Sequence, residues 1–409
     1  MENTIFILVI ALIIADFLVG SGLGFINHRW RKKPVPEAVK DVYSEEKYIT
    51  YQNYKQETFR LSVITSFITL AATLVMFLGG FALLDNWLRE LISAEIALSI
   101  IFFAVVGIAS DLLSLPFDIY STFKIEQKYG FNTMTVKTFI LDKIKTYMLA
   151  LIIGFPLLYL IIWLYMTFGD NFWWMVWIVI SVFSIIMSLL YSSVIVPIFN
   201  KQSPLPDGQL REEIAQLAER TGFKLDNVYV IDGSKRSTRA NAYFTGFGAK
   251  KRIVLYDTLL NTQSNNEIIS VLAHEIGHYK KKHTIKGLIA SIIQTGLLLF
   301  LFSRIMNYQV LYDSLGVVPG FHIGLIVFVI LYSPVSFILS IWGNYISRKY
   351  EYQADNYAAE VASGDALITS LKGLSSSNLS DLNPHPLYVK AYYSHPPLID
   401  RVNALKNRS

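Results

Sequence analysis

The 409-residue sequence contains no cysteine, which excludes disulfides, thiolate chemistry and metal sites built with cysteine. Any transition-metal site must therefore use histidine, aspartate and glutamate. Histidine is also scarce: the chain has seven, and three of them, His274, His278 and His283, fall within ten residues. The absence of cysteine leads us to expect a bacterial source.

Charge is sparse as well. Charged residues make up 16% of the chain, against about 25% in an ordinary soluble protein. Hydrophobic residues make up 53% and the mean hydropathy is +0.41, which indicates a large membrane-embedded fraction. The basic residues fall in loops between apolar runs, and no basic-aromatic module is present. We therefore expect the bilayer, and not nucleic acid, as the partner.

Seven segments are long and apolar enough to cross a hydrocarbon core of about 30 Å as helices. The first has no basic N-terminal region and no small-residue cleavage pattern, so it is predicted to be a retained span and not a signal peptide. The predicted spans are 5–25, 61–84, 94–115, 147–167, 173–196, 285–305 and 320–342.

The distribution of Lys and Arg predicts the orientation of these spans. With the N-terminus outside, only Arg89 and Arg304 of the 36 basic residues fall on the outer side, so 34 fall inside. The net charge of +5 is therefore interpreted as a topology signal. A partner-binding patch is the alternative for any single loop.

Two long inner segments hold most of the polar sequence. Residues 200–282 read as a small α+β unit, with an amphipathic helix at 208–221 and β-rich runs at 228–231, 241–245 and 252–256. Ser264 and Glu267 form a capping-box pattern that predicts the start of a helix. We predict a mainly α, polytopic membrane fold, divided into 1–199 (spans one to five), 200–283 (α+β segment), 284–343 (spans six and seven) and a C-terminal segment, 344–409.

The predicted helix carries His274-Glu275-Ile276-Gly277-His278, which is the pattern H-E-x-x-H. Residues four apart share one helical face, so both imidazoles can bind one ion. Glu275 lies beside that ion and can take a proton from water that the ion activates. A pair of surface histidines without a metal is the alternative for so short a motif.

A catalytic zinc site needs a third protein ligand. Glu351 is the candidate, because the helix that continues the seventh span emerges on the same side as the histidine pair. Asp355 follows at i+4 and is placed to accept the second ring N–H of a ligand histidine. The spacing alone leaves an ordinary solvated helix face as the alternative.

His395 lies in the turn Tyr393-Ser394-His395-Pro396-Pro397, where the prolines fix the following backbone. A histidine held there could donate a hydrogen bond to the oxyanion of a tetrahedral intermediate, or it could be a solvated turn residue. Neither spacing nor context gives the four remaining histidines a role; they are His28, His283, His322 and His385.

These motifs and several further stretches resemble the type 1 CAAX prenyl protease family of integral membrane zinc metallopeptidases, over essentially the whole chain. The further stretches are Leu-Pro-Phe at 115–117, Ile-Glu-Gln-Lys-Tyr-Gly-Phe-Asn at 125–132, Pro-Leu-Pro at 204–206, Gly-Ser-Lys-Arg-Ser at 233–237, Asn-Ala-Tyr-Phe at 241–244 and Lys-Arg-Ile-Val-Leu-Tyr-Asp-Thr-Leu-Leu at 251–260.

The resemblance implies seven helices that enclose a water-filled chamber, one Zn²⁺ held by His274, His278 and Glu351, and catalysis by Glu275. It also implies that Asn241 belongs to an edge strand that binds the substrate backbone, as an extended peptide can, and that His395 and Arg401 lie near the reacting peptide. The implied substrate is a prenylated CAAX protein, which loses its last three residues. Polar residues near the inner end of the third span are candidates to line the chamber; they are Ser110, Asp111 and Asp118.

Three hypotheses remain for the function. The first is the CAAX-type endopeptidase, acting on a prenylated or membrane-associated substrate and needing no obligate protein partner. The second keeps the chemistry but assigns it to quality control of membrane proteins without prenyl groups. The third is a metal-binding channel or chaperone without turnover, which the presence of Glu275 argues against. The protein is expected in the bacterial inner membrane, or in the endoplasmic reticulum if eukaryotic, with its catalytic segment on the cytosolic side.

Overall fold

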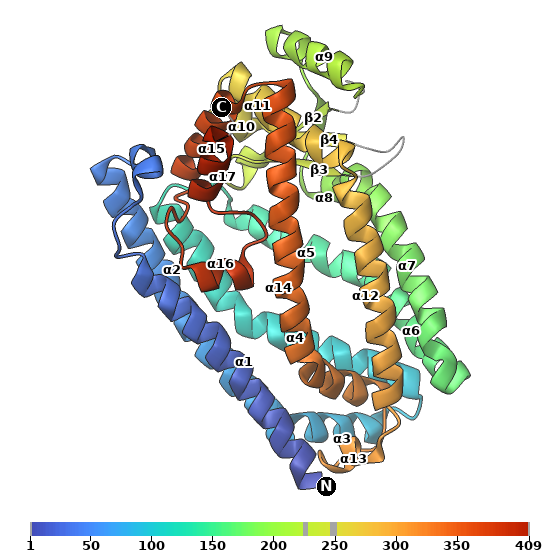
Figure 1. Ribbon diagram of the computed structural model, residues 1–409. Coiled ribbons are helices and arrows are strands. Elements are labelled where there is room, and N and C mark those ends of the chain that lie inside the picture. Colours follow the sequence, from blue (N-terminus) through green and yellow to red (C-terminus); the bar gives the residue numbers. More distant parts are fainter. Residues whose placement is uncertain (1, 224–227, 246–251, 408–409) are drawn as a thin grey trace.

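The computed structural model describes residues 2–223, 228–245 and 252–407. Long tilted helices form one half of the molecule, and a small sheet with shorter helices forms the other, at the end opposite the N-terminus (Figure 1). The helices of the first half are α1 (Glu2–Trp30), α2 (Glu45–Val75), α3 (Phe81–Leu91), α4 (Glu95–Tyr120), α5 (Val136–Leu149), α6 (Phe155–Phe168), α7 (Phe172–Leu190), α8 (Val196–Phe199), α12 (His283–Ile305), α13 (Gln309–Asp313) and α14 (Phe321–Val361).

Six helical stretches are long and apolar enough to cross a membrane. The fourth, Val136–Phe199, contains both of the spans predicted at 147–167 and 173–196, which are separated by the short turn Gly169–Asn171. The count of seven crossings therefore stays a prediction. The continuation of the last span into the helix of Glu351 is confirmed, because α14 runs for 41 residues without a break.

The other half is built on a four-stranded sheet in the order β1-β2-β4-β3, with β2 and β4 parallel and the outer pairs antiparallel. The predicted β-rich runs are strands β2 (Val228–Ile231), β3 (Ala242–Thr245) and β4 (Arg252–Tyr256), whereas β1 (Gln202–Pro204) was not predicted. The helices of this half are α9 (Gln209–Thr221), α10 (Asp257–Leu260), α11 (Asn265–Lys280), α15 (Gly364–Ser377) and α17 (Leu398–Lys406). The short helix α16 (Pro386–Tyr392) lies among the long helices, against α1 and α14.

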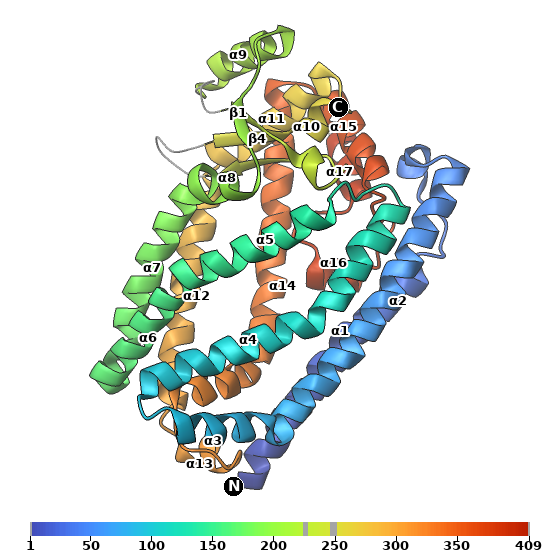
Figure 2. The same cartoon turned by 180° about the vertical axis from the view of Figure 1, so that it is seen from behind.

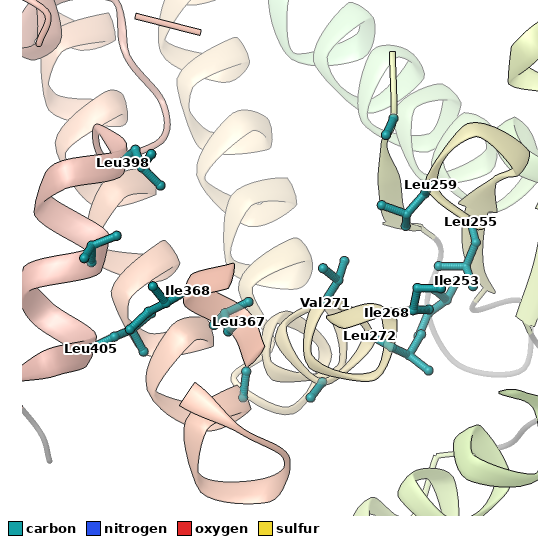
Figure 3. Close-up of a cluster of buried hydrophobic side chains, with 14 of the residues drawn as sticks. Ile253, Leu255, Leu259, Ile268, Val271, Leu272, Leu367, Ile368, Leu398 and Leu405 are labelled. Carbon is teal, nitrogen blue, oxygen red and sulfur yellow. The ribbon is translucent and has the colours of Figure 1, made fainter. Parts of the chain in front are cut away.

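Helix α11 is the centre of this half. Its N-terminus has the predicted capping box: the Glu267 carboxylate accepts a hydrogen bond from the backbone N–H of Ser264 at 2.7 Å. Figure 3 shows Ile268 and Leu272 toward the strand residues, with Val271 between them and the C-terminal helices. Burying each of these side chains contributes roughly 1.5–3 kcal/mol, so the core fixes α11 against both sides.

The membrane half contains connected cavities beside two clusters of buried hydrophobic side chains. Only 6% to 28% of the residues in the apolar windows of its long helices are buried. Cavities of about 640 and 600 Å³ share Thr58, Ser62 and Ser66 of α2, and the second shares Tyr392 with a third of about 850 Å³. Hydroxyl side chains of α2 therefore line a hollow at membrane depth, as a water-filled space requires. Asp118 lines the first cavity, as predicted.

His322, which the sequence left without a role, lies in a buried polar cluster far from the metal-binding motif. Its Nε2 is 2.8 Å from the carboxylate of Asp85, and its Nδ1 is 2.9 Å from the hydroxyl of Ser99. Arg89 pairs with the same aspartate at 3.0 Å. The cluster joins α3, α4 and α14 at the end near the N-terminus (Figure 2), where it satisfies buried polar groups.

Candidate metal centre and active site

Helices α11 and α14 bring the three predicted ligands together. The Nε2 atoms of His274 and His278 lie 3.1 Å apart. Glu351 Oε1 lies 3.2 Å from His278 Nε2, and Glu351 Oε2 lies 3.5 Å from His274 Nε2. One ligand atom from each residue falls within 4.8 Å of the others, which is a geometry that one ion could fill.

Close packing of the two helices makes this convergence possible. Gly277 lies against Ala354, and a Cβ added to this glycine would come within 3.1 Å of the Ala354 backbone. Ala354 and Ala358 are fully buried on the same face of α14 as Glu351 and Asp355. Small residues on both helices thus let their axes approach until the carboxylate reaches the imidazoles.

The residues present fit a metal ion. Glu351 Oε2 is buried and accepts no hydrogen bond from the part of the chain that the structure describes, as expected of an atom that a cation would satisfy. Burial lowers the pKa of His274, but hydrogen bonds to the carboxylates of Asp355 and Glu351 outweigh it and raise that pKa to about 9. The site therefore attracts a positive charge. Two imidazole nitrogens and one carboxylate are also the donor set of catalytic zinc sites.

The second ring nitrogen of each histidine has its own partner. His274 Nδ1 lies 2.8 Å from Asp355 Oδ1, where the sequence predicted it. His278 Nδ1 lies 3.0 Å from His283 Nδ1, and His283 Nε2 lies 2.9 Å from the amide oxygen of Gln353. Such contacts fix which nitrogen of each ligand faces the ion.

Arg401 lies behind the ligands. Its guanidinium donates two hydrogen bonds to Asp355, at 2.8 and 2.5 Å, and one guanidinium nitrogen is 3.6 Å from Glu351 Oε2. Arg401 is only 9% exposed. Its charge is therefore balanced by the carboxylate of Asp355 and not by solvent. Its predicted contact with substrate stays a prediction.

Glu275 faces the sheet side of the centre. Burial raises the pKa of its carboxyl, while the nearby His274 and His278 and a hydrogen bond with the backbone of Phe244 oppose that rise. A carboxyl whose pKa moves toward neutrality is a better proton carrier at pH 7. The contact with Phe244 also places it next to β3.

Asn241 and His395 are the two remaining predicted residues. Asn241 is exposed and directly precedes β3, which is an edge strand of the described sheet, as the family resemblance implied. His395 Nε2 lies 3.4 Å from Glu351 Oε1, and the side chain is 65% accessible. An accessible imidazole and an open strand edge therefore flank the ligands.

Comparisons with known proteins assign this architecture to a family. Residues 26–201 match the profile "CAAX prenyl protease N-terminal, five membrane helices", and residues 204–409 match "Peptidase family M48". The chain is 36% identical to CAAX prenyl protease 1 of Saccharomyces cerevisiae, over 96% of this chain and 94% of the relative. The chain belongs to peptidase family M48.

Other members of M48 agree with this assignment. The human CAAX prenyl protease 1 homolog is 35% identical over 76% of this chain and 74% of its own length. The crystal structure of S. mikatae Ste24p superposes with a TM-score of 0.90, at 35% identity, and covers 98% of both chains. This M48 protein is a multi-pass, membrane-embedded metallopeptidase of the CAAX prenyl protease type, which rules against the channel or chaperone hypothesis.

His283 is the residue of this M48 site that sequence reasoning missed. The helix of His274 ends at Lys280, Lys282 takes a left-handed conformation with φ of 58°, and His283 begins α12. The turn brings the imidazole back to His278, where it stacks on Tyr350 with ring centroids 4.1 Å apart. No residue pattern marked this contact, because lysine is an ordinary helix former and the turn depends on the left-handed conformation of Lys282.

We expect His283→Ala to weaken metal binding by about 10- to 100-fold, because the neighbour that orients His278 would be lost. Competition with a chromophoric chelator measures the affinity. The matched control is His28→Ala, which removes a histidine that stacks on Phe59 instead. Equal affinity of the His283 variant and the unmodified protein would show that His283 does not orient the ligand.

Proposed function

We propose that this protein is a zinc metallo-endopeptidase that cleaves prenylated CAAX proteins or peptides near the C-terminus and releases their last three residues. The observation that carries the proposal is the convergence of His274, His278 and Glu351 beside Glu275, in a chain whose membrane half contains a hollow. The names of the relatives, CAAX prenyl protease 1 and its homologs, support the substrate class.

Each residue has a part in this reaction. His274, His278 and Glu351 would hold one Zn²⁺ and leave a position open. When bound, the ion supplies a Lewis acid that lowers the pKa of a water molecule toward about 7. Glu275 accepts a proton from the attacking water and delivers it to the nitrogen of the leaving peptide.

The flanking residues bind and orient the substrate. The substrate backbone pairs with β3 beyond Asn241, as peptides do when they extend an open sheet edge. His395 donates a hydrogen bond from its ring N–H to the oxyanion that forms at the scissile carbonyl. Asp355 and Arg401 hold His274 and Glu351 from behind. The hollow supplies both water and an apolar wall for the prenyl chain.

We propose that the metal-bearing half faces the cytosol, because 34 of the 36 basic residues lie on that side in the predicted topology. This would place it at the inner face of a bacterial membrane or at the endoplasmic reticulum of a eukaryote. The relatives named above include yeast and human proteins, which lend no support to the bacterial source.

The test offers purified protein a farnesylated CAAX peptide and its unprenylated twin, with and without a zinc chelator. We expect the farnesylated peptide to lose its last three residues, the chelator to abolish the reaction, and Zn²⁺ to restore it. Mass spectrometry identifies the product. Equal cleavage of both peptides would favour the quality-control hypothesis, and chelator-resistant cleavage would contradict a metal mechanism.

A further inference from the structure

A cavity of about 600 Å³ lies between α1, α2 and α16, at the junction of the hollow with the catalytic half. Figures 1 and 2 both show α16 on the inner side of the α1–α2 pair. Its charged lining residues are Arg31, Lys55 and Asp381, and three tyrosines of the α16 segment add hydroxyl groups, namely Tyr388, Tyr392 and Tyr393. None of these residues has a part in the reaction described above.

The charges around this cavity do not balance. Arg31 pairs with Asp381 at 3.4 Å, and Arg239 pairs with Glu126 at 2.8 Å. These four groups are the charged neighbours that act on Lys55. Lys55 forms no ion pair with any carboxylate of the described residues. Its Nζ lies 5.3 Å from the centroid of the Tyr54 ring. One positive charge is therefore left over at the cavity.

Residues at the cavity connect to two segments that carry predicted site residues. Arg239 donates a hydrogen bond to the hydroxyl of Tyr54, the neighbour of Lys55, at 2.6 Å, and Arg239 is two residues before Asn241 and the edge strand. On the other side, Tyr393 lines the cavity and is two residues before His395. Tyr51 and Tyr54 also pack in the same core as α11. Tyr54 thus connects the helix of Lys55 to the segment that carries Asn241, and the cavity lining connects it to the segment that carries His395.

A cation at this place suits one particular group, the free end of a substrate chain. Three residues of an extended peptide span about 10 Å, so a substrate cut three residues from its end carries its terminal carboxylate about that far from the scissile bond. An internal peptide segment has no such charge. A cation with no protein partner gains most from a ligand that brings the missing negative charge.

We propose that Lys55, with Arg31 beside it, binds the free C-terminal carboxylate of the substrate peptide. This inference rests on the function proposed above. Such a site would explain how the enzyme selects the C-terminal end of a substrate over an internal segment of a peptide. The same chemistry could bind the headgroup of an anionic lipid, so the experiment must separate the two ligands.

The experiment compares a fluorescent farnesylated CAAX peptide that ends in a free acid with the same peptide ending in an amide. Binding is measured by anisotropy on full-length protein in the Glu275→Gln background, so that no peptide is consumed, and kcat and KM are measured in parallel with Glu275 intact. We expect the acid to bind about tenfold more tightly than the amide, and KM to change while kcat does not.

Three substitutions locate that preference. Lys55→Met should bind acid and amide peptides alike, whereas Lys55→Arg should keep the preference because it keeps the charge. Lys47→Met is the matched control: it removes a lysine from the same helix that does not line this cavity, and it should behave as the unmodified protein.

The outcomes separate this inference from the proposed function. Equal binding of acid and amide by the unmodified protein, or an undiminished preference in Lys55→Met, would overturn the carboxylate site even if cleavage proceeds. A preference that depends on Lys55 would support the site even if the peptide is not cleaved. If Lys55→Met changes only the response to added anionic lipid, the cavity binds a headgroup and the proposal is wrong.

Discussion

Replacement of Glu275 by glutamine is expected to lower the rate of peptide cleavage by about 10²–10⁴-fold, because the amide cannot accept the proton of the attacking water. The side chain keeps its size, and none of the three ligand atoms is changed, so the protein should bind the same amount of zinc. Cleavage of the farnesylated peptide measures the rate, and elemental analysis of the purified protein measures the metal.

Two controls make this result specific. Glu219→Gln makes the same chemical change on an exposed face of α9 and should leave the rate unchanged. Glu275→Asp keeps a carboxylate on a shorter stem and should retain more activity than the glutamine variant. Full activity in Glu275→Gln would refute the mechanism, whereas low activity together with low zinc content would make Glu275 a determinant of metal binding instead.

Local signals in the sequence predicted the parts of the fold that local interactions determine. Ser264 and Glu267 gave the start of α11, and the continuity of apolar and helical sequence through Asn344 gave α14. Strand β1 was missed because three residues are too few to show an alternating pattern; it exists through its pairing with β2. The connected cavities could not be predicted from the spacing of apolar residues along the helices. A residue that faces lipid and a residue that faces a cavity are both accessible, so the spacing does not distinguish them.

The site residues also fall into those that a local pattern predicted and those that tertiary packing determines. The four-residue spacing of His274 and His278 identified two ligands, because one helix sets their geometry. Glu351 needed the resemblance, and its contact with the histidines depends on small residues at a helix crossing, such as Gly277 and Ala354. The partners of Arg401 and His283 are set by tertiary packing and by a turn, neither of which a residue pattern encodes.

Replacement of Asp355 by asparagine is expected to have two separate effects, because this carboxylate touches both His274 Nδ1 and the guanidinium of Arg401. Loss of the charge that orients His274 should weaken zinc binding by about 10- to 100-fold. Loss of the partner of a buried arginine should also destabilise the catalytic half by about 3–5 kcal/mol. Chelator competition measures the first effect, and thermal unfolding in detergent measures the second.

The double variant Asp355→Asn/Arg401→Met separates these effects. Removal of the unpaired guanidinium should restore much of the lost stability, since a buried charge without a partner costs more than an apolar side chain of similar length. It should not restore zinc affinity, because His274 still lacks its carboxylate. If the double variant regains full affinity, Asp355 acts on the metal centre only by neutralising Arg401; if the single variant binds zinc as tightly as the unmodified protein, Asp355 does not orient the ligand at all.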